Sequence, residues 1–171
     1  KRTTMLALLL ATGAGTCLQA QEKLTQFKVR DAITVRTPIM NDSINPKGEK
    51  YADKDLLKTP VVLDLADAPF QVLSTDTAGV LSFPKAEKDH SIYLLETSLR
   101  AERFMTGKLK VTSPARWEIF INGESKMSKE NAEDSISGAS TREVNLRLEP
   151  EADYEITIKL LSGSKDKAVP T

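Results

Sequence analysis

The fold is decided by the stretch Phe104–Gly123, which reads FMTGKLKVTSPARWEIFING. Residues 108–112 alternate polar and apolar side chains, the period-two pattern of a half-buried strand. A second apolar strand follows at 117–121, directly before Asn122-Gly123. Asn-Gly supplies the positive φ angles that a tight hairpin turn requires. This stretch therefore predicts strands of an antiparallel sheet.

Similar short apolar segments, separated by Pro, Gly, Asn and Ser, lie on both sides of this stretch. No window of a dozen residues beyond the first twenty has the 3.6-residue period of a helix. The polar segment 124–140 is predicted to be a loop. We expect a mainly β chain folded as an antiparallel β-sandwich, jelly-roll or immunoglobulin-like. The other predicted strands are 61–65, 70–73, 80–83, 92–99, 144–148 and 154–160.

The first twenty residues have the layout of a secretory signal peptide. A basic start is followed by the apolar run Met5–Ala11 and then by small residues up to Ala20, which is the order that such leaders share. The run is too short to span a bilayer permanently. We expect a cleavable signal peptide at 1–20, with no transmembrane helix, and export to the periplasm or cell surface. A lipid anchor on Cys17 is less favoured, because Thr16 fits a lipoprotein signal poorly.

The remainder of the chain divides by composition into three parts. Residues 21–58 are predicted to be an N-terminal extended segment or loop, and 59–163 the β-sandwich domain. Residues 164–171 are predicted to be an exit linker. The sequence leaves open whether residues 21–58 pack on the sandwich.

Charge and cysteine content exclude several functions. The chain has 24 basic and 24 acidic residues. Removal of Lys1 and Arg2 leaves 22 basic residues against 24 acidic ones, a net charge of −2. This balance gives no basic face for nucleic acid. The only cysteine is Cys17, so the exported part has no disulfide, thiol nucleophile or cysteine metal site.

The sequence offers little material for catalysis or cofactor binding. His90, the only histidine, lies in a charged loop, and a surface role is favoured over a place in a Ser-His-Asp site. No glycine-rich phosphate loop is present. Asp64 with Asp67, or Asp53 with Asp55, could supply calcium ligands, but solvated acidic loops are the favoured interpretation. We predict no catalytic residue, metal site or cofactor.

Two aromatic side chains are candidates for stacking on a sugar ring, Trp117 and Tyr93. Trp117 shares a strand face with Ile119 and Ile121, so a place in the core is favoured for it.

Three tripeptides resemble the Asp-Ser/Thr-aliphatic acceptor for O-glycosylation of exported proteins in some Gram-negative bacteria. Their acceptor residues are Ser43, Thr77 and Ser135. All three lie in predicted loops, where a glycan would have room.

Two pieces of the chain, 107–124 and 148–158, resemble small bacterial surface β-sandwiches of the PEGA type. Asn122-Gly123 matches that family's hairpin turn, and the run Leu-Glu-Pro150-Glu-Ala-Asp-Tyr154 resembles the tyrosine corner of fibronectin-like sandwiches. The resemblance implies that the Tyr154 hydroxyl bonds to backbone just upstream. The chain departs from the family after Pro114 and in a polar insert of about 17 residues after the hairpin.

With the strands from 60 to 100 included, the chain also resembles a galactose-binding-like jelly roll. Such modules often stand at the front of exported bacterial hydrolases. The matching motifs chiefly encode turns, so they inform the fold more than the function. We expect a non-catalytic module that binds or positions a glycan, an envelope protein or a downstream domain of the same chain. The alternatives are an N-terminal accessory domain of a larger exported peptidase or glycosidase, and a structural spacer.

Overall fold

The computed structural model describes residues 3–12, 21–22, 24–30, 33–34, 48, 55, 57–58, 69–84, 91–133 and 138–162. All of the regular elements that it bounds are strands. In chain order they are β1 (Thr3–Thr12), β2 (Gln21–Glu22), β3 (Gln26–Arg30), β4 (Ile33–Thr34), β5 (Phe70–Ser74), β6 (Val80–Pro84), β7 (Ser91–Arg100), β8 (Met105–Thr112), β9 (Arg116–Ile121), β10 (Glu124–Lys129), β11 (Thr141–Leu148) and β12 (Asp153–Ser162).

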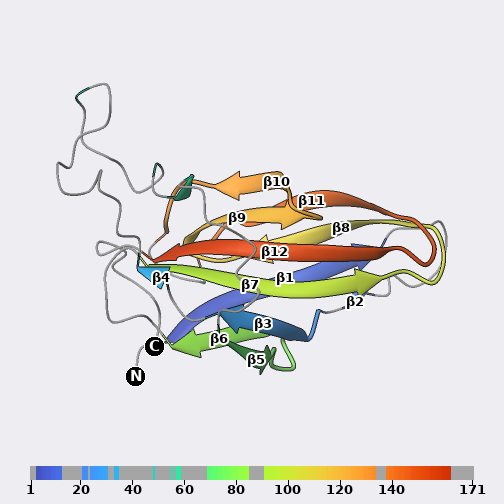
Figure 1. Ribbon diagram of the computed structural model, residues 1–171, viewed down its shortest axis with the longest axis horizontal. Coiled ribbons are helices and arrows are strands. Elements are labelled where there is room, and N and C mark those ends of the chain that lie inside the picture. Colours follow the sequence, from blue (N-terminus) through green and yellow to red (C-terminus); the bar gives the residue numbers. More distant parts are fainter. Residues whose placement is uncertain are drawn as a thin grey trace.

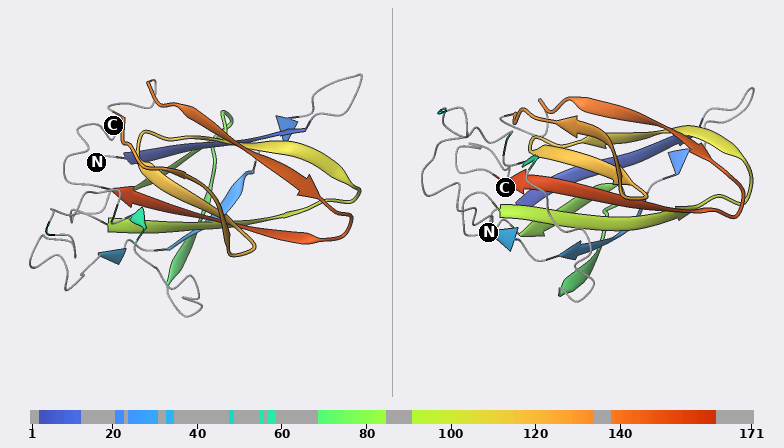
Figure 2. Two further views of the ribbon diagram at one scale, coloured as in Figure 1. Left: turned by 90° about the horizontal axis from the view of Figure 1, so that it is seen from above. Right: turned by 45° about the horizontal axis from the view of Figure 1, so that its top comes forward.

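The strands form two antiparallel sheets (Figure 1). Sheet A has five strands in the order β11-β8-β1-β2, with β6 also paired to β1. Sheet B has seven strands in the order β10-β9-β12-β7-β3-β5, with β4 also paired to β7. Seen from above, β1 and β8 lie in one layer and β7 and β12 in the other (Figure 2). The predicted mainly β, antiparallel character is confirmed.

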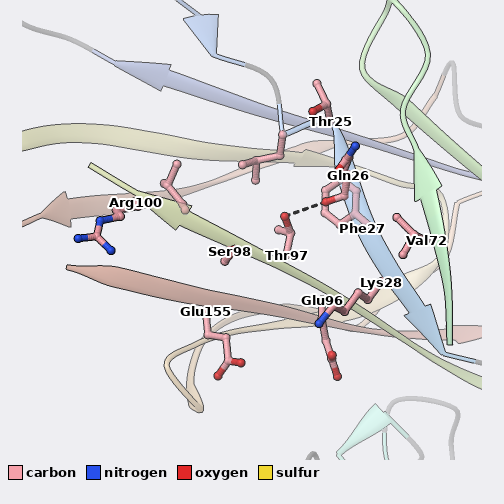
Figure 3. A pocket seen from close by; sticks show the side chains of 12 residues that line it. Thr25, Gln26, Phe27, Lys28, Val72, Glu96, Thr97, Ser98, Arg100 and Glu155 are labelled. Carbon is pink, nitrogen blue, oxygen red and sulfur yellow. Dashed lines mark hydrogen bonds between the residues drawn. The ribbon is translucent and has the colours of Figure 1, made fainter. Parts of the chain in front are cut away.

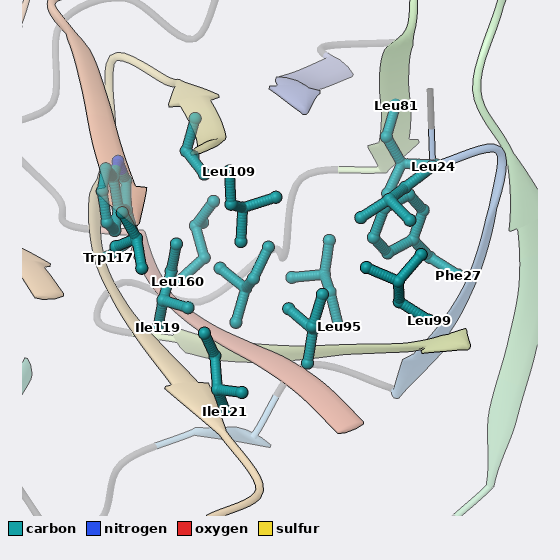
Figure 4. Packing of buried hydrophobic residues seen from close by; sticks show 14 of the residues in the cluster. Leu24, Phe27, Leu81, Leu95, Leu99, Leu109, Trp117, Ile119, Ile121 and Leu160 are labelled. Atoms are coloured by element: carbon teal, nitrogen blue, oxygen red, sulfur yellow. The ribbon is translucent and has the colours of Figure 1, made fainter. Parts of the chain in front are cut away.

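A single apolar core joins the inner faces of the two sheets (Figure 4). Sheet A contributes Leu109 and Val111 from β8, and sheet B contributes Leu95 and Ile158, all of them fully buried. Phe27 of β3 belongs to the same core and is 1% exposed. Alternating residues of β9 and β11 and of the second half of β8 are buried, so the arrangement is consistent with a β-sandwich.

Part of sheet B is also covered on its outer face. Ile92 and Leu94 alternate with the core residues of β7, and Leu161 alternates with those of β12, yet all three have no exposed surface. A strand that is buried on both faces reads as a continuous apolar run rather than an alternating one. The run Ile92–Leu95 follows this rule.

The hairpin at Asn122-Gly123 shows where the sequence prediction of a loop was wrong. Asn122 and Gly123 have φ angles of 51° and 77°, and the chain turns straight back into β10, which pairs with β9. We predicted a loop over 124–140, but its first part is this strand. β10 lies at the edge of the sheet and is mostly exposed, so its side chains are polar and the apolar signal of a strand is weak.

The segment 21–58 contributes to the sheets. Its β3 pairs with β7 on one side and with β5 on the other. This bears on the question left open by the sequence: residues 26–30 and 33–34 of the segment pair in sheet B. The predicted strand at 61–65 lies outside the described residues.

The backbone of residues 3–12, within the predicted leader, forms β1. It pairs with β8 over Ala7–Thr12 and with β6 over Thr3–Ala7. Among the described strands, β1 is therefore the connection between β8 and β6.

The crossing from sheet A to sheet B between β11 and β12 carries the predicted corner. The Tyr154 hydroxyl accepts a hydrogen bond from the backbone N–H of Glu149, with 2.8 Å between the two atoms. Pro150 forms an isolated bridge with Ala101, and Glu151 takes a positive φ of 58°. These contacts are of the type that the tyrosine-corner resemblance predicts.

Candidate functional site

A cleft of about 520 Å³ opens where β3 separates from β7 (Figure 3). The two strands pair at Lys28 with Glu96 and at Val29 with Leu95, and their ladder ends there. Beyond that point β7 continues to Arg100, and no described residue forms a ladder with it on this side. The cleft is lined by residues 24–28 and 96–100, with Val72 and Glu155.

The register shows that the backbone of Ser98 faces the cleft. Glu155 pairs with Ser98 across β12 and β7, but its N–H and C=O both bond to Asn122, each at 2.8 Å. In an antiparallel ladder both groups of a residue point to the same side, so Glu155 and Ser98 are a non-hydrogen-bonded pair. Ser98 therefore directs its own N–H and C=O away from β12 and into the cleft. Arg100, two residues on, has the same orientation.

At this end of the cleft a side chain of β7, and not its backbone, binds β3. The Thr97 hydroxyl donates to the carbonyl oxygen of Gln26 at 2.8 Å (Figure 3). In a continued ladder the Ser98 N–H would bond to this carbonyl, because Gln26 would then stand opposite Ser98. The hydroxyl takes the place of that N–H and keeps Gln26 of β3 close to β7 at this end of the cleft.

The walls of the cleft carry both paired and unpaired charges. Arg30 and Glu96 form a two-point ion pair, with Nε–Oε1 and Nη2–Oε2 distances of 2.9 and 3.3 Å. Arg100 binds Glu151 at 2.6 Å. Lys28 and Glu155, by contrast, are exposed and have no ion-pair partner among the described residues. They stand on opposite walls, Lys28 on β3 and Glu155 on β12 (Figure 3).

The two predicted stacking residues lie elsewhere, in the core. Trp117 has no exposed surface and Tyr93 is 5% exposed, so neither ring presents a face to a ligand at the surface. The core position that the strand pattern favoured for Trp117 is the one observed. Its indole N–H is buried and has no hydrogen-bond acceptor among the described residues.

Only one of the predicted glycosylation residues lies in the described part of the chain. Thr77 is exposed in the turn between β5 and β6, where the Asp76 carboxylate accepts the N–H groups of Ala78 and Val80 at 2.8 and 2.9 Å. Ser43 and Ser135 lie outside the described residues, as do His90 and the acidic residues Asp53, Asp64 and Asp67.

Metal binding and membrane crossing each need a particular feature of the described ranges. There, no group of three or more His, Cys, Asp or Glu side chains is placed to hold a metal ion. The same ranges contain no helix long and apolar enough to cross a membrane.

A buried ion pair closes the connection that leaves β10. Lys129 is 2% exposed, and its Nζ lies 2.6 Å from the Glu133 carboxylate and 2.5 Å from the Ser113 carbonyl oxygen. Burial acts to raise the pKa of Glu133, but hydrogen bonds from Lys129 and Ser140 outweigh it, so the pKa lies below its ordinary value. The pair links the segments that carry Ser113, Lys129 and Ser140.

A second charge cluster lies on the outer face of sheet A. The Glu143 carboxylate accepts Lys108 at 2.9 Å and contacts Lys110 at 3.1 Å across the β8–β11 ladder. Hydrogen bonds from these two lysines lower the pKa of Glu143. This is an ordinary solvated sheet face, in which cross-strand ion pairs contribute little to stability.

None of the cleft residues was singled out by the sequence. Lys28, Ser98 and Glu155 are common polar residues on the outward side of strands, and such residues usually face solvent. One signal was present: Thr97 and Ser98 are polar residues next to each other inside the apolar strand 92–99. These two residues interrupt the apolar run of the strand at the place where its described ladder with β3 ends.

Comparisons with protein-family models, with curated proteins and with solved structures give no match to this chain. The resemblance to PEGA-type and galactose-binding-like modules therefore stays a prediction.

Proposed function

We propose that this chain is a non-catalytic binding module of an exported protein, and that its ligand occupies the β3–β7 cleft. Export is supported by the order of basic, apolar and small residues in the first twenty positions. The binding role is supported by a preformed recess in a rigid sheet, a common setting for recognition.

The observation that carries this proposal is the opening of the sheet between β3 and β7. Where the described ladder ends, Ser98 and Arg100 turn their main-chain N–H and C=O groups toward the cleft, and such groups need water or a ligand as a hydrogen-bond partner when no strand pairs with them. Lys28 and Glu155 add two exposed charges of opposite sign at the same place. The end of the β3–β7 ladder would serve a function if the cleft binds another molecule.

The lining favours a polar ligand over one that stacks on aromatic rings. The aromatic side chain in the lining is Phe27, which is 1% exposed. Sugar recognition by stacking needs an open ring face, and the lining provides none. Between the glycan and protein ligands that the sequence left open, this favours a protein.

The proposal is tested by screening the protein, beginning at Gln21, against a glycan array and a displayed library of random octapeptides. We expect binding that Lys28→Ala and Glu155→Ala each weaken by about tenfold, the value of one lost charged contact. Lys108→Ala, an exposed lysine of sheet A, is the matched control and should bind normally. If no ligand is found, or if the cleft variants bind as the parent does, the proposal is wrong.

Export is tested separately by mass spectrometry of the protein recovered from a bacterial envelope. We expect a mature N-terminus at Gln21. A diacylated Cys17 at the N-terminus would instead show a lipoprotein, and a retained leader would overturn export.

A further inference from the structure

We propose that two copies of this chain associate through the outer edge of β5, which pairs with β5 of the second copy as an antiparallel strand across a two-fold axis. β5 stands at the end of sheet B, next to β3 (Figure 1). The inference goes beyond the binding function proposed above, because it concerns the border of the sheet and not the cleft.

Three residues of β5 turn their main-chain groups away from β3. The N–H of Thr75 donates to the carbonyl oxygen of Thr25 at 2.9 Å, which makes these two residues a hydrogen-bonded pair at the end of the β3–β5 ladder. Such pairs alternate along an antiparallel ladder, and the register of this ladder is continuous. Phe70, Val72 and Ser74 therefore direct their N–H and C=O groups outward, where no described residue forms a ladder with them.

The same side of the strand is apolar and exposed. Phe70 and Val72 are 47% and 60% exposed, and they are two of the three large apolar side chains that are exposed in the described part of the chain. Both lie on the outer face of sheet B, because Leu73 alternates with them and packs against the core. An exposed apolar strand at the border of a sheet is a template for pairing with another chain.

Two other outer strands carry the protection that β5 lacks. β10, at the opposite border of sheet B, reads ESKMSK, and its register against β9 shifts between Ser125 and Met127. β11, at a border of sheet A, reads TREVNLRL. Charges and bulges of this kind keep sheet edges from pairing. β5 reads FQVLS and has a continuous register, so of these three edges it is the one suited to association.

The residues of β5 match those of a second β5 in antiparallel register. A two-fold axis at Val72 places Phe70 opposite Ser74 of the second copy. The small serine leaves room for the ring, and Val72 of the second copy lies diagonally across from it, an aromatic and β-branched contact that stabilises sheets. Each of these pairs uses outward main-chain groups on both strands, so each forms hydrogen bonds across the axis.

The charges beside the edge are also self-complementary. The Lys28 ammonium lies 5.3 Å from the centre of the Phe70 ring and has no ion-pair partner among the described residues. The Asp76 carboxylate stands beyond Ser74 at the other end of the strand, where backbone N–H groups hold it. An antiparallel pair exchanges the two ends, so Lys28 of each copy lies at the end that carries Asp76 of the other. This match favours a second copy as the occupant.

Analytical ultracentrifugation of the full chain, from micromolar to millimolar concentration, tests the proposal. The contact is one strand of five residues per copy, so we expect a reversible dimer of micromolar affinity or weaker. Ser74→Pro removes an outward N–H, while the bonds to β3 are made by neighbouring residues. Because the axis doubles this loss, dimerisation should weaken by about thirtyfold. Ser74→Ala, the matched control, keeps the N–H and should dimerise as the parent does.

A second pair of variants compares two exposed phenylalanines. Phe70 and Phe104 are 47% and 48% exposed, and each ring packs under an arginine side chain, Arg30 for one and Arg147 for the other. Phe104 lies outside β5. Phe70→Ala should weaken the dimer by about tenfold through lost apolar contact, and Phe104→Ala should leave it unchanged. Val72 is kept in all variants, because it also lines the cleft.

Amide hydrogen exchange gives a readout that needs no variant. Raising the protein concentration should slow exchange at Phe70, Val72 and Ser74, whose N–H groups point outward. Gln71 and Leu73 bond to β3 and should exchange slowly at every concentration. This alternation within one strand distinguishes main-chain pairing from contact between side chains alone.

The outcomes separate this inference from the proposed function. A monomer at every concentration would overturn self-association, as would a dimer that survives both Ser74→Pro and Phe70→Ala. Slower exchange at the three outward amides on addition of another envelope protein, with no effect of concentration, would show a different occupant and would also overturn it. All of these measurements are made without a cleft ligand, so failure of the cleft to bind leaves them unaffected.

Discussion

The two sheets differ in what holds them together. In sheet B, β12 pairs with β7 over ten residues and with β9 over six, and all of these strands lie beyond residue 90. In sheet A, the described link between β8 and β6 runs through β1, whose residues 3–12 lie in the predicted leader. Sheet B is therefore stabilised by the domain itself, whereas the continuity of sheet A depends on a segment that export would remove.

Removal of the predicted leader would therefore affect the two sheets unequally. Cleavage after Ala20 would take away the partner of Gly107–Thr112 on β8 and the partner of Val80–Pro84 on β6. Unpaired strand edges associate readily with other chains unless they are covered or charged. The contributions of the two sheets and of the connections between them can be separated by experiment.

The largest effect is expected in the core of sheet B, at Trp117. Replacement by Ala removes the largest fully buried side chain and should lower the free energy of unfolding by about 3–5 kcal/mol. Trp117→Phe should cost clearly less, because it fills most of the volume and removes a buried N–H that has no acceptor. Urea unfolding followed by circular dichroism measures both. A loss below about 1 kcal/mol for Trp117→Ala would mean that this core is not cooperative.

The next effect is confined to sheet A. In the chain beginning at Gln21, amide hydrogen exchange of β8 and β6 should accelerate by about a hundredfold. This acceleration corresponds to a loss of roughly 2.7 kcal/mol of local stability. Exchange in β7 and β12 should change little, because their pairing does not involve β1. Comparison with the chain that retains the leader provides the control. Equal exchange in both chains would show that β1 adds nothing to sheet A.

The connection out of β10 gives a pH-dependent effect of intermediate size. Hydrogen bonds from Lys129 and Ser140 lower the pKa of Glu133 in the folded state. The stability that the Glu133 carboxylate contributes is therefore present above pH 4.5, the ordinary pKa of this group. It is lost as the pH falls through the lower pKa of the folded state. Glu133→Gln should cost about 1–3 kcal/mol at pH 7, since it leaves Lys129 buried without its anion.

Unfolding free energies of the parent and of Glu133→Gln, measured from pH 7 down to pH 3, test this prediction. The difference between the two proteins should shrink as the pH falls through 4.5 and below. A difference that is the same at every pH would exclude the Glu133 carboxylate as its source.

The smallest effect is expected at the crossing between the sheets. Tyr154→Phe removes the hydroxyl that accepts the Glu149 N–H and should destabilise the protein by about 1 kcal/mol. The change should appear in the urea midpoint with an unchanged slope, because no other contact is altered. An unchanged midpoint would remove the structural role of the corner.

The sequence by itself predicted the class of fold and the positions of most strands. Alternation in 108–112, 144–148 and 154–160 marked strands with one buried face, and Asn122-Gly123 marked a turn, because these features follow from local backbone geometry. The same local signals failed at β10, whose exposed edge position removes the apolar pattern, and they left the place of β3 open. Both β10 and β3 are recognised as strands by the strands that they pair with, more clearly than by their own residues.

The tertiary structure alone decided which strands are neighbours, and with them the candidate site. Lys28, Ser98 and Glu155 are separated by scores of residues in the chain and meet only because β3, β7 and β12 lie side by side. The cleft depends on where one ladder ends, and that end is set by the register between β3 and β7, a long-range property that no local pattern encodes. Composition and periodicity determine which residues are buried, whereas pairing between distant strands determines which polar groups are left open.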